Sequence, residues 1–476
     1  MKKPISLILA LLLCLSLSAC ARRPESSPAA AESTAVPEAE TAVEPSGEPL
    51  TGTETAAAPE SEPAAEEAPA EAAAETVSPE PAPAAETPSP AKVYEPERLE
   101  TDALSWDFDP AAGLLSIHGS GPMRDYAQNA PEWEQYKDQI RAVALDEGIT
   151  SVGGYAFFNY LALTEARLPD SVEVIDCSAF DYCWELRSIT IPAALKYVGD
   201  RAFYNTLLWS PADLVFPEGC EYIGDKAFHS ALKSGGIVSL PSTLEYLGEM
   251  AFTNAYLSDF AVSENNAFYR SENHAVYSKD GKTMCMLAPV AAHPAEFQVP
   301  AGVERICPEC FNVIRGIERI CLPASVTEIS EGAFFSTFEL KEIAVDPENL
   351  SFKSENGLLL SKDGTRLLAW PDGIPAAELV IPDGVQRLDS HLFYGRIDGT
   401  YAVMLPEGLK EIGSMSLPGS MSSLTLPASL EKIGANVFYG GISVGSVTYA
   451  GTAADWANVI IEDGNDALSG LSIQMS

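Results

Sequence analysis

Two cysteines in the middle of the chain have a spacing that can support redox or metal chemistry. The motif is Cys307-Pro308-Glu309-Cys310, and such a pair either exchanges disulfides or supplies half of a zinc site. A zinc site would need a second pair, which the sequence lacks. In the repeat described below, Cys307 replaces a glycine and Cys310 an alanine, so both slots require small, buried side chains. We therefore expect structural thiols, with a disulfide or a thiol oxidoreductase as the alternatives.

Other groups match catalytic or metal motifs only in part. The string Gly441–Gly445 fits Gly-x-Ser-x-Gly, but a nucleophile elbow needs a later histidine, and the last one, His391, lies upstream. The five histidines form no His-x-x-x-His pair, and acidic strings such as Asp107–Asp109 lack the glycine and glutamate of a calcium loop. The sequence predicts a protein that is not an enzyme, with no catalytic residue, metal site or cofactor.

Any functional site in this chain must be positioned by the sequence repeat that makes up most of its folded part. Its pattern is Leu-Pro-x-x-Val-x-x-Ile-Gly-x-x-Ala-Phe, as in the copy from Leu168 to Phe180. The copies begin at Leu145, Leu168, Ile191, Phe216, Leu240, Val299, Leu322, Ile381, Leu405 and Leu426. Starts are 21 to 25 residues apart, except for two steps of 59 residues. A period near 23 residues with apolar side chains at fixed slots predicts a solenoid whose turns bury their faces on their neighbours.

Each copy contains a short alternating stretch that suits a strand, ended by a proline that cannot donate to a sheet. The phenylalanine slot is filled in every copy except at Leu417, and we interpret it as a stacked core column. It is occupied by Phe157, Phe180, Phe203, Phe228, Phe252, Phe311, Phe334, Phe393 and Phe438. Both 59-residue steps hold matching inserts, with Asp280-Gly281 and Asp363-Gly364 between apolar runs. Because Asp-Gly favours tight turns, we predict two β-hairpins that project from the solenoid.

One polar slot of each strand should face outward and could form a binding face. Across the copies this column holds Ala144, Arg167, Thr190, Val215, Ser239, Gln298, Cys321, Val380, Met404 and Thr425. The polar candidates for a ligand are Arg167, Thr190, Ser239, Gln298 and Thr425. The alternative interpretation is that short side chains simply suit a crowded parallel ladder, and the two inserts are the other candidate surface.

The N-terminal part differs in kind from the rest. Residues 1–19 have two lysines, an apolar run and the ending Leu17-Ser18-Ala19 before Cys20, as in a secretion signal. Residues 20–91 are rich in Ala, Glu, Pro, Ser and Thr, and the stretch 24–91 lacks Lys, Arg and aromatic residues, so we expect a disordered acidic tether. The formal charge of −39 argues against nucleic-acid binding. We place an N-terminal cap at 92–144, the solenoid at 145–448 and a C-terminal cap at 449–476.

These features together resemble a known family. The repeats, the Asn…Ser-x-x-Asp-Gly inserts, the segment from Leu104 to Trp133 and the end from Tyr449 to Ile460 are similar to BspA-like leucine-rich repeat surface lipoproteins. The resemblance implies an α+β repeat solenoid, a leucine-rich-repeat-like stack of short parallel strands with two inserted β-hairpins and end caps. The ending before Cys20 resembles a lipobox, which implies lipidation of Cys20 and anchorage at the bacterial cell surface.

We accordingly expect a non-enzymatic, secreted, lipid-anchored protein whose solenoid binds an extracellular or host protein or a glycan, as some adhesins of this family do. The membrane would be contacted only through the N-terminal lipid. The second hypothesis is a structural or spacer protein of the envelope without a discrete ligand, and the third is a thiol oxidoreductase at Cys307 and Cys310.

Overall fold

The computed structural model describes residues 104–208, 213–233, 235–375, 378–393, 401–438, 443–465, 468 and 473–475. The chain divides into two units, Met1–Ser89 and Pro90–Ser476, and every described residue belongs to the second unit. The expected signal peptide, tether and Cys20 lie outside the described residues. Within the described part, no helix has the length and apolar character that a membrane span requires.

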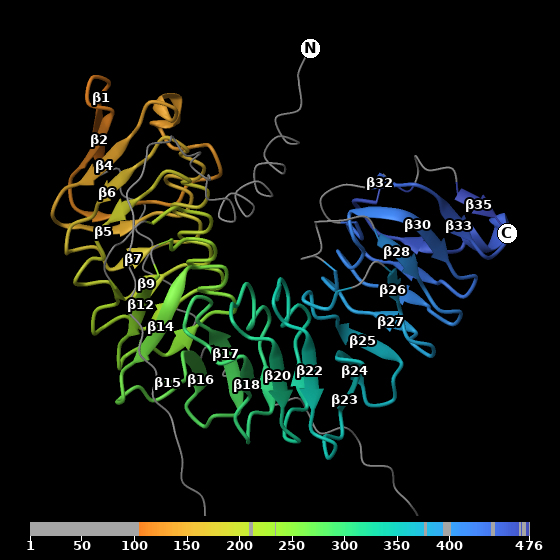
Figure 1. Ribbon diagram of the computed structural model, residues 1–476. Coiled ribbons are helices and arrows are strands. Elements are labelled where there is room, and N and C mark those ends of the chain that lie inside the picture. The colour runs from red at the N-terminus through yellow and green to blue at the C-terminus, as the bar shows by residue number, and fades with distance from the viewer. Residues whose placement is uncertain are drawn as a thin grey trace, which may run out of the picture. The chain divides into compact units, whose positions relative to one another are not determined.

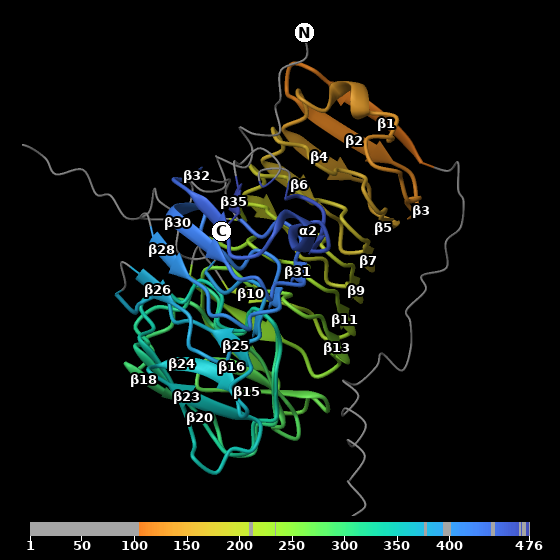
Figure 2. The same ribbon diagram turned by 90° about the vertical axis from the view of Figure 1, so that its right-hand side faces the viewer.

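Each repeat gives one strand to each of two faces of a solenoid, and Figures 1 and 2 show successive turns stacked with these strands side by side. The first face consists of four sheets in which most neighbours are parallel. They contain β1 (Ser105–Asp109), β2 (Leu114–His118), β4 (Ala142–Leu145), β6 (Glu165–Arg167) and β8 (Ser188–Ile189); β10 (Leu214–Val215), β12 (Gly236–Leu240) and β14 (Leu257–Val262); β18 (Glu296–Gln298), β20 (Arg319–Leu322) and β22 (Glu342–Val345); and β26 (Glu378–Val380), β28 (Tyr401–Met404), β30 (Ser420–Leu426), β32 (Ser443–Val444), β33 (Val447–Tyr449) and β35 (Ile473–Met475).

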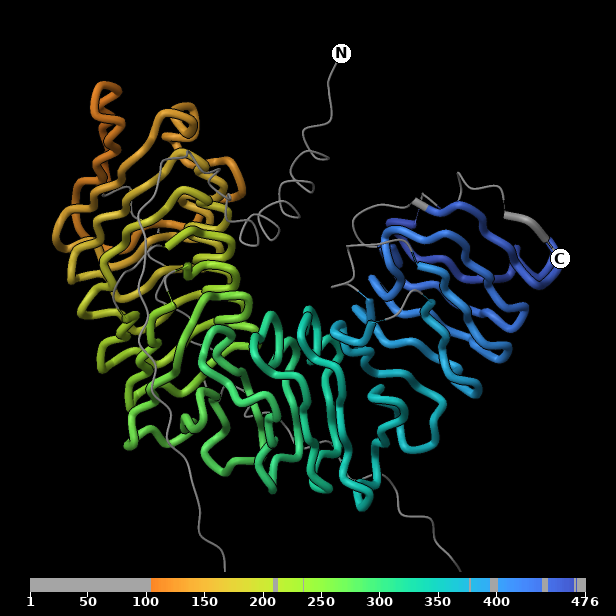
Figure 3. Tube along the Cα trace, in the orientation of Figure 1, coloured from red at the N-terminus to blue at the C-terminus, as the bar shows by residue number. Residues whose placement is uncertain are grey.

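The second face is built from the Val-x-x-Ile segments and forms three sheets. They contain β3 (Gly121–Pro122), β5 (Ile149–Val152), β7 (Val174–Ile175), β9 (Tyr197–Val198), β11 (Tyr222–Ile223) and β13 (Tyr246–Leu247); β15 (Tyr269–Glu272), β16 (Ala275–Ser278), β17 (Thr283–Leu287), β19 (Arg305–Ile306) and β21 (Glu328–Ile329); and β23 (Phe352–Glu355), β24 (Leu358–Ser361), β25 (Arg366–Ala369), β27 (Arg387–Leu388), β29 (Glu411–Ile412), β31 (Lys432–Ile433) and β34 (Ile460–Ile461). The Cα trace follows these turns one above another (Figure 3).

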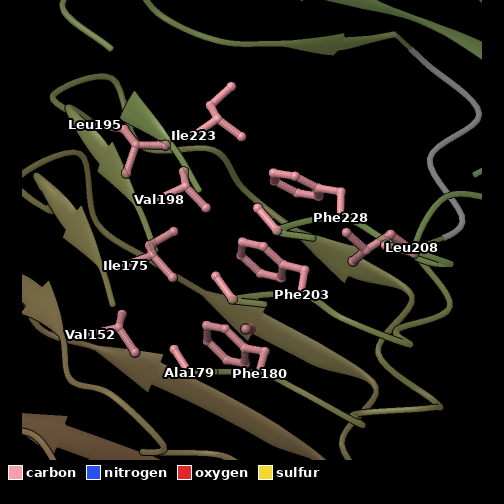
Figure 4. Close-up of a cluster of buried hydrophobic side chains, with 14 of the residues drawn as sticks. Val152, Ile175, Ala179, Phe180, Leu195, Val198, Phe203, Leu208, Ile223 and Phe228 are labelled. Carbon is pink, nitrogen blue, oxygen red and sulfur yellow. The ribbon is translucent and has the colours of Figure 1, made fainter. Parts of the chain in front are cut away.

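The apolar slots stack into columns between the two faces. Phe180 and Phe203 lie with ring centroids 5.4 Å apart, and Phe203 and Phe228 lie 4.9 Å apart, all fully buried. Figure 4 shows these rings beside a second column that includes Ile175, Val198 and Ile223. Burial of these repeated side chains supplies the main stabilisation of a fold that has little regular helix.

The glycine that follows the second-face strand allows adjacent turns to approach closely. A Cβ on Gly199 would lie 2.5 Å from the backbone nitrogen of Cys177 in the preceding turn. Two residues later the chain reverses at positive φ, as at Arg201 (57°) and Lys226 (56°). A residue at positive φ cannot belong to an α-helix, so these turns stay irregular.

The inserts extend the second face instead of projecting from it, which corrects the prediction made above. β16 pairs with β15 and with β17 in antiparallel register, and the segment with Asp280-Gly281 joins β16 to β17. β17 then pairs in parallel with β19 of the next repeat. The second insert has the same order, with β24 antiparallel to β23 and β25 and with β25 parallel to β27. The inserted strands therefore lie within the stack.

The class also needs correction, from α+β to a β-solenoid. The helices bounded within the described residues are the 3-10 helix η2 (Glu134–Tyr136) and the four-residue α2 (Ala453–Trp456). Antiparallel β1 and β2 and the aromatic residues around η2 cover the first turn, where Trp133 stacks on Phe157 at 5.8 Å. At the other end, Thr452 caps α2 through a capping box with Asp455.

Candidate recognition surface

The outward column predicted from the sequence is divided among the four sheets of the first face. Arg167 ends β6, Ser239 lies in β12, Gln298 in β18 and Thr425 in β30, while Thr190 follows β8. Register brings together Val215 with Ser239, Gln298 with Cys321, and Val380 with Met404 and Thr425. These residues therefore form short separate groups along the first face.

Two polar members of this column, Arg167 and Gln298, have partners on their own strands. The Arg167 guanidinium donates two hydrogen bonds to Glu165, at 2.8 and 3.0 Å, and the Gln298 amide donates to Glu296 at 2.6 Å. In the last group, the side chains of Val380 and Met404 are about half exposed, at 51% and 53%. The column thus presents paired charges and scattered apolar side chains.

A more regular surface, missed from the sequence, lies on the second face. The residues before the buried apolar residue of β9, β11 and β13 are Tyr197, Tyr222 and Tyr246, which we call the tyrosine ladder. Their rings stack with centroids 4.6 Å apart at both steps and with interplanar angles of 16° and 13°. All three side chains remain partly exposed. The signal was present in the sequence as a tyrosine two residues before each of Gly199, Gly224 and Gly248.

Carboxylates border the tyrosine ladder. The Tyr246 hydroxyl donates to Asp225 at 3.0 Å, and Asp225 and Asp200 follow the glycines of consecutive turns. Burial raises the pKa of the Tyr222 hydroxyl to about 12, with the nearby Asp200 and Asp225 acting in the same direction. The ladder therefore stays neutral at physiological pH, and it combines flat ring faces with hydrogen-bonding oxygens.

The adjoining turns carry a second set of rings. Tyr182 and Tyr204 lie 5.7 Å apart, Tyr204 stacks on His229 at 4.9 Å, and the Arg201 guanidinium lies 3.9 Å from the Tyr204 ring centre. Arg201 also binds the buried Asp181 at 2.9 Å. Rings of this kind with fixed polar neighbours can pack against a sugar ring or an apolar side chain while hydrogen bonds fix its orientation.

The most enzyme-like group of side chains is Ser230, His229 and Glu309. The Ser230 hydroxyl lies 3.0 Å from His229 Nδ1, and His229 Nε2 lies 3.5 Å from a Glu309 oxygen. Ser230 is buried, however, and its oxygen already accepts a hydrogen bond from Asn254 at 2.8 Å. Although burial opposes it, the hydrogen bond from His229 lowers the pKa of Glu309. We interpret the group as a contact between turns.

The N-terminal cap contains a pocket of about 350 Å³ lined by residues that include Trp106, Tyr126 and Trp133. Arg124 at its wall forms an ion pair with Glu132 and lies 5.2 Å from the Tyr126 ring centre. These charges are satisfied within the cap, so the pocket belongs to the packing that covers the first turn.

The serine and cysteine motifs noted in the sequence can be located in the described part of the structure, which can also be searched for metal-binding clusters. Ser443 lies in β32, which pairs with β30, whereas a nucleophile elbow places its serine at a strand-to-helix turn; Gly441 and Ile442 lie outside the described residues. No cluster of three or more potential metal-binding side chains occurs in the described ranges. Cys307 and Cys310 are both buried in the turn after β19.

Comparison with known proteins identifies the family. The model of the BspA type leucine-rich repeat region matches residues 135–233, 293–356 and 373–458 in six copies, just over half of the chain. The chain therefore belongs to the BspA-type leucine-rich repeat family. No curated protein gives a significant match in sequence.

Solved structures of bacterial leucine-rich repeat proteins are similar to this chain at low sequence identity. A leucine-rich repeat protein from Eubacterium ventriosum is 22% identical, with 72% of this chain and 93% of that chain covered and a TM-score of 0.50. A leucine-rich cell surface protein from Faecalibacterium prausnitzii is 18% identical over 77% of this chain and 98% of that chain, with a TM-score of 0.43.

Proposed function

We propose that this protein is a non-enzymatic recognition protein of the bacterial surface and that the tyrosine ladder contacts its ligand. The observation that carries the proposal is the ordered stack of three partly exposed rings beside carboxylates. Tyrosines supply contact area at low conformational cost, and they are enriched at protein recognition surfaces. The ligand class is an extracellular or host protein or a glycan, and membership of a family of repeat proteins supports a binding role.

Binding of the purified protein to a panel of extracellular-matrix proteins and glycans at physiological salt tests this proposal. Tyr222→Ala, in the middle of the ladder, should weaken a saturable interaction by about tenfold or more, since buried aromatic contacts often exceed about 1.4 kcal/mol. Met404→Ala is the matched control, because its exposed side chain lies on the first face. Circular dichroism and Tm would verify that both variants fold.

The Met404→Ala control also distinguishes a ligand bound at the first face from one bound at the tyrosine ladder. If Met404→Ala or Arg167→Glu weakens binding and Tyr222→Ala does not, the ligand lies on the first face and the ladder assignment is wrong. If a folded protein binds nothing across a broad panel, the envelope spacer becomes the better hypothesis.

The proposal includes an anchor at Cys20 and a tether over 20–91. Replacement Cys20→Ser should move the protein from the membrane fraction to the soluble fraction, because one lipidation site then disappears. Retention of the Cys20→Ser protein in membranes would contradict the lipid anchor without affecting the recognition surface.

A further inference from the structure

The thiol nearest in register to Cys307 belongs to the first insert and is not its sequence partner Cys310. β17 pairs in parallel with β19, with Met284 opposite Ile306, and the backbone N–H of Cys307 donates to Met284 at 3.0 Å. The next residues along the two segments are Cys285 and Cys307, so this register makes their side chains neighbours. Residues in register on adjacent strands point to the same side of a sheet.

The surroundings make the two sulfurs unequal. Cys307 is buried, with 6% of its surface exposed, while Cys285 is partly exposed. The hydrogen bond from Cys285 and then the charge of Arg305 lower the pKa of Cys307, whereas the same hydrogen bond and burial raise the pKa of Cys285. An Arg305 nitrogen lies 3.6 Å from the Cys307 sulfur. The Cys307 sulfur therefore ionises more readily than the Cys285 sulfur, and a readily formed thiolate favours exchange with disulfides.

Cys310 lacks this arrangement. Its side chain is 2% exposed, and burial and then the nearby Cys307 raise its pKa well above the ordinary value. A neutral, enclosed thiol is a poor nucleophile. The Cys-x-x-Cys spacing thus suggests Cys310 as the partner of Cys307, whereas the strand register favours Cys285.

The second insert occupies the same junction with a different cross-link. There Asp389, one residue after β27, occupies the position equivalent to Cys307. The Arg366 guanidinium in β25 donates two hydrogen bonds to the Asp389 carboxylate, one of them at 2.8 Å. In most turns that follow an ordinary repeat, this slot is a glycine such as Gly224 or Gly413, which the preceding turn crowds, although Asp176 and Ser330 also occupy it. After each insert, the side chain in this slot is a neighbour of the inserted strand, with Cys307 next to β17 and Asp389 hydrogen-bonded to Arg366 in β25.

We propose that Cys285 and Cys307 are a redox modification site, which closes to a disulfide by exchange with a small or protein disulfide and fastens the first insert to the following turn. Once Cys307 has lost its own proton to solvent, the Cys285 thiol passes its proton to the Cys307 sulfur and attacks one sulfur of the external disulfide, which releases a first thiolate. Cys307 then loses that proton to solvent, attacks the Cys285 sulfur and releases the second thiolate. Two electrons thus pass from the cysteine pair to the external disulfide, which leaves as two thiols.

Peptide mapping of the intact protein in glutathione buffers tests the proposal. After equilibration with glutathione disulfide and alkylation of free thiols, mass spectrometry should find Cys285 linked to Cys307, with Cys310 and Cys321 alkylated. The oxidised protein should unfold at a Tm a few degrees above that of the reduced protein, because the bond closes a loop in the unfolded chain. Cys285→Ser should abolish that rise, and Cys321→Ser should preserve it.

Three results would overturn the assignment. They are a Cys307–Cys310 bond, thiols that all stay reduced in a folded protein, and a stable glutathione adduct on Cys285 that Cys307 does not resolve. Mapping uses the unaltered chain, so it does not depend on whether a variant folds. Arg305→Gln supplies a separate readout, because loss of its charge should move the pH midpoint of Cys307 alkylation upward.

Discussion

At the scale of single residues, two buried asparagines anchor the inserts in the same way. The Asn266 amide nitrogen donates to the carbonyls of Pro241 and Leu244, both at 2.9 Å, and its oxygen accepts from the backbone of Phe268 and Tyr269. Asn349 repeats this pattern in the second insert, with two donated and two accepted bonds. Each side chain thus uses its full hydrogen-bonding capacity between two turns.

Replacement of Asn266 by aspartate keeps the shape and removes both donors. We expect Asn266→Asp to lower the free energy of unfolding by about 2–4 kcal/mol, because a carboxylate oxygen would face two carbonyls in a buried site. Denaturant titration measures the loss. Asn273→Asp at an exposed turn is the control and should change stability by less than about 0.5 kcal/mol. Equal effects of the two variants would show that the Asn266 bonds contribute little.

A second residue, Asp181, makes stability depend on pH. Its side chain is 1% exposed, and burial raises its pKa from 3.8 to about 6 despite the Arg201 contact. Between these two pKa values the folded state holds a proton that the unfolded state has lost. The contribution of Asp181 to stability is thus complete below pH 4, falls as pH rises to 6, and stays constant above that.

Comparison with Asp181→Asn isolates this contribution. The free energy of unfolding of the unaltered protein minus that of the variant should fall by on the order of 3 kcal/mol between pH 4 and pH 7. Chemical denaturation at four pH values in this range measures the difference. A difference that does not change with pH would mean that Asp181 ionises in the folded protein as it does in the unfolded chain.

At the scale of elements, the sequence indicated the repeats and their core but not how the inserts join them. The 23-residue period specified which side chains stack, such as Phe180 on Phe203, because core contacts repeat locally. Strand pairing across an insert is non-local, so the Asp-Gly turns could not show that β16 and β17 continue the second face. The tyrosine ladder was overlooked because a single tyrosine in a repeat does not indicate stacking, which depends on the ring one turn away.

The placement of the first insert changes what its deletion would do. Removal of residues 273–282 takes out all of β16, with the buried Val276 and Tyr277, and removes the strand pairing with β17. We therefore expect this deletion to cost several kcal/mol, as lost core side chains do, and to increase proteolysis. Asn273→Gly at the turn should leave Tm nearly unchanged, since glycine readily adopts the φ of 50° found there. A deletion variant with an unchanged Tm would mean that the insert folds independently of the stack.

At the scale of the whole solenoid, equivalent ion pairs span both inserts. Arg305 binds Glu249 at 2.8 Å, and Arg387 binds Glu331 at 2.8 Å, in each case across 56 residues of sequence. Charge pairs of this exposure contribute little individually and weaken in salt. The apolar cores are also separate, with one cluster over 115–291, a second over 275–369 and a third over 358–468. The stack therefore consists of three cores joined at two inserts.

Such a stack should lose stability locally when one core is damaged. Leu424 is 1% exposed and lies in register between Val403 and Val447 in the third cluster. We expect Leu424→Ala to cost about 2–5 kcal/mol and to speed hydrogen exchange in β28, β30 and β33 while β5–β11 keep their protection. Val198→Ala in the first cluster should give the reverse pattern. We expect these local effects because a solenoid turn contacts only its neighbours. Hydrogen exchange followed by mass spectrometry distinguishes local unfolding from a single cooperative unit, in which either variant would speed exchange in all three cores.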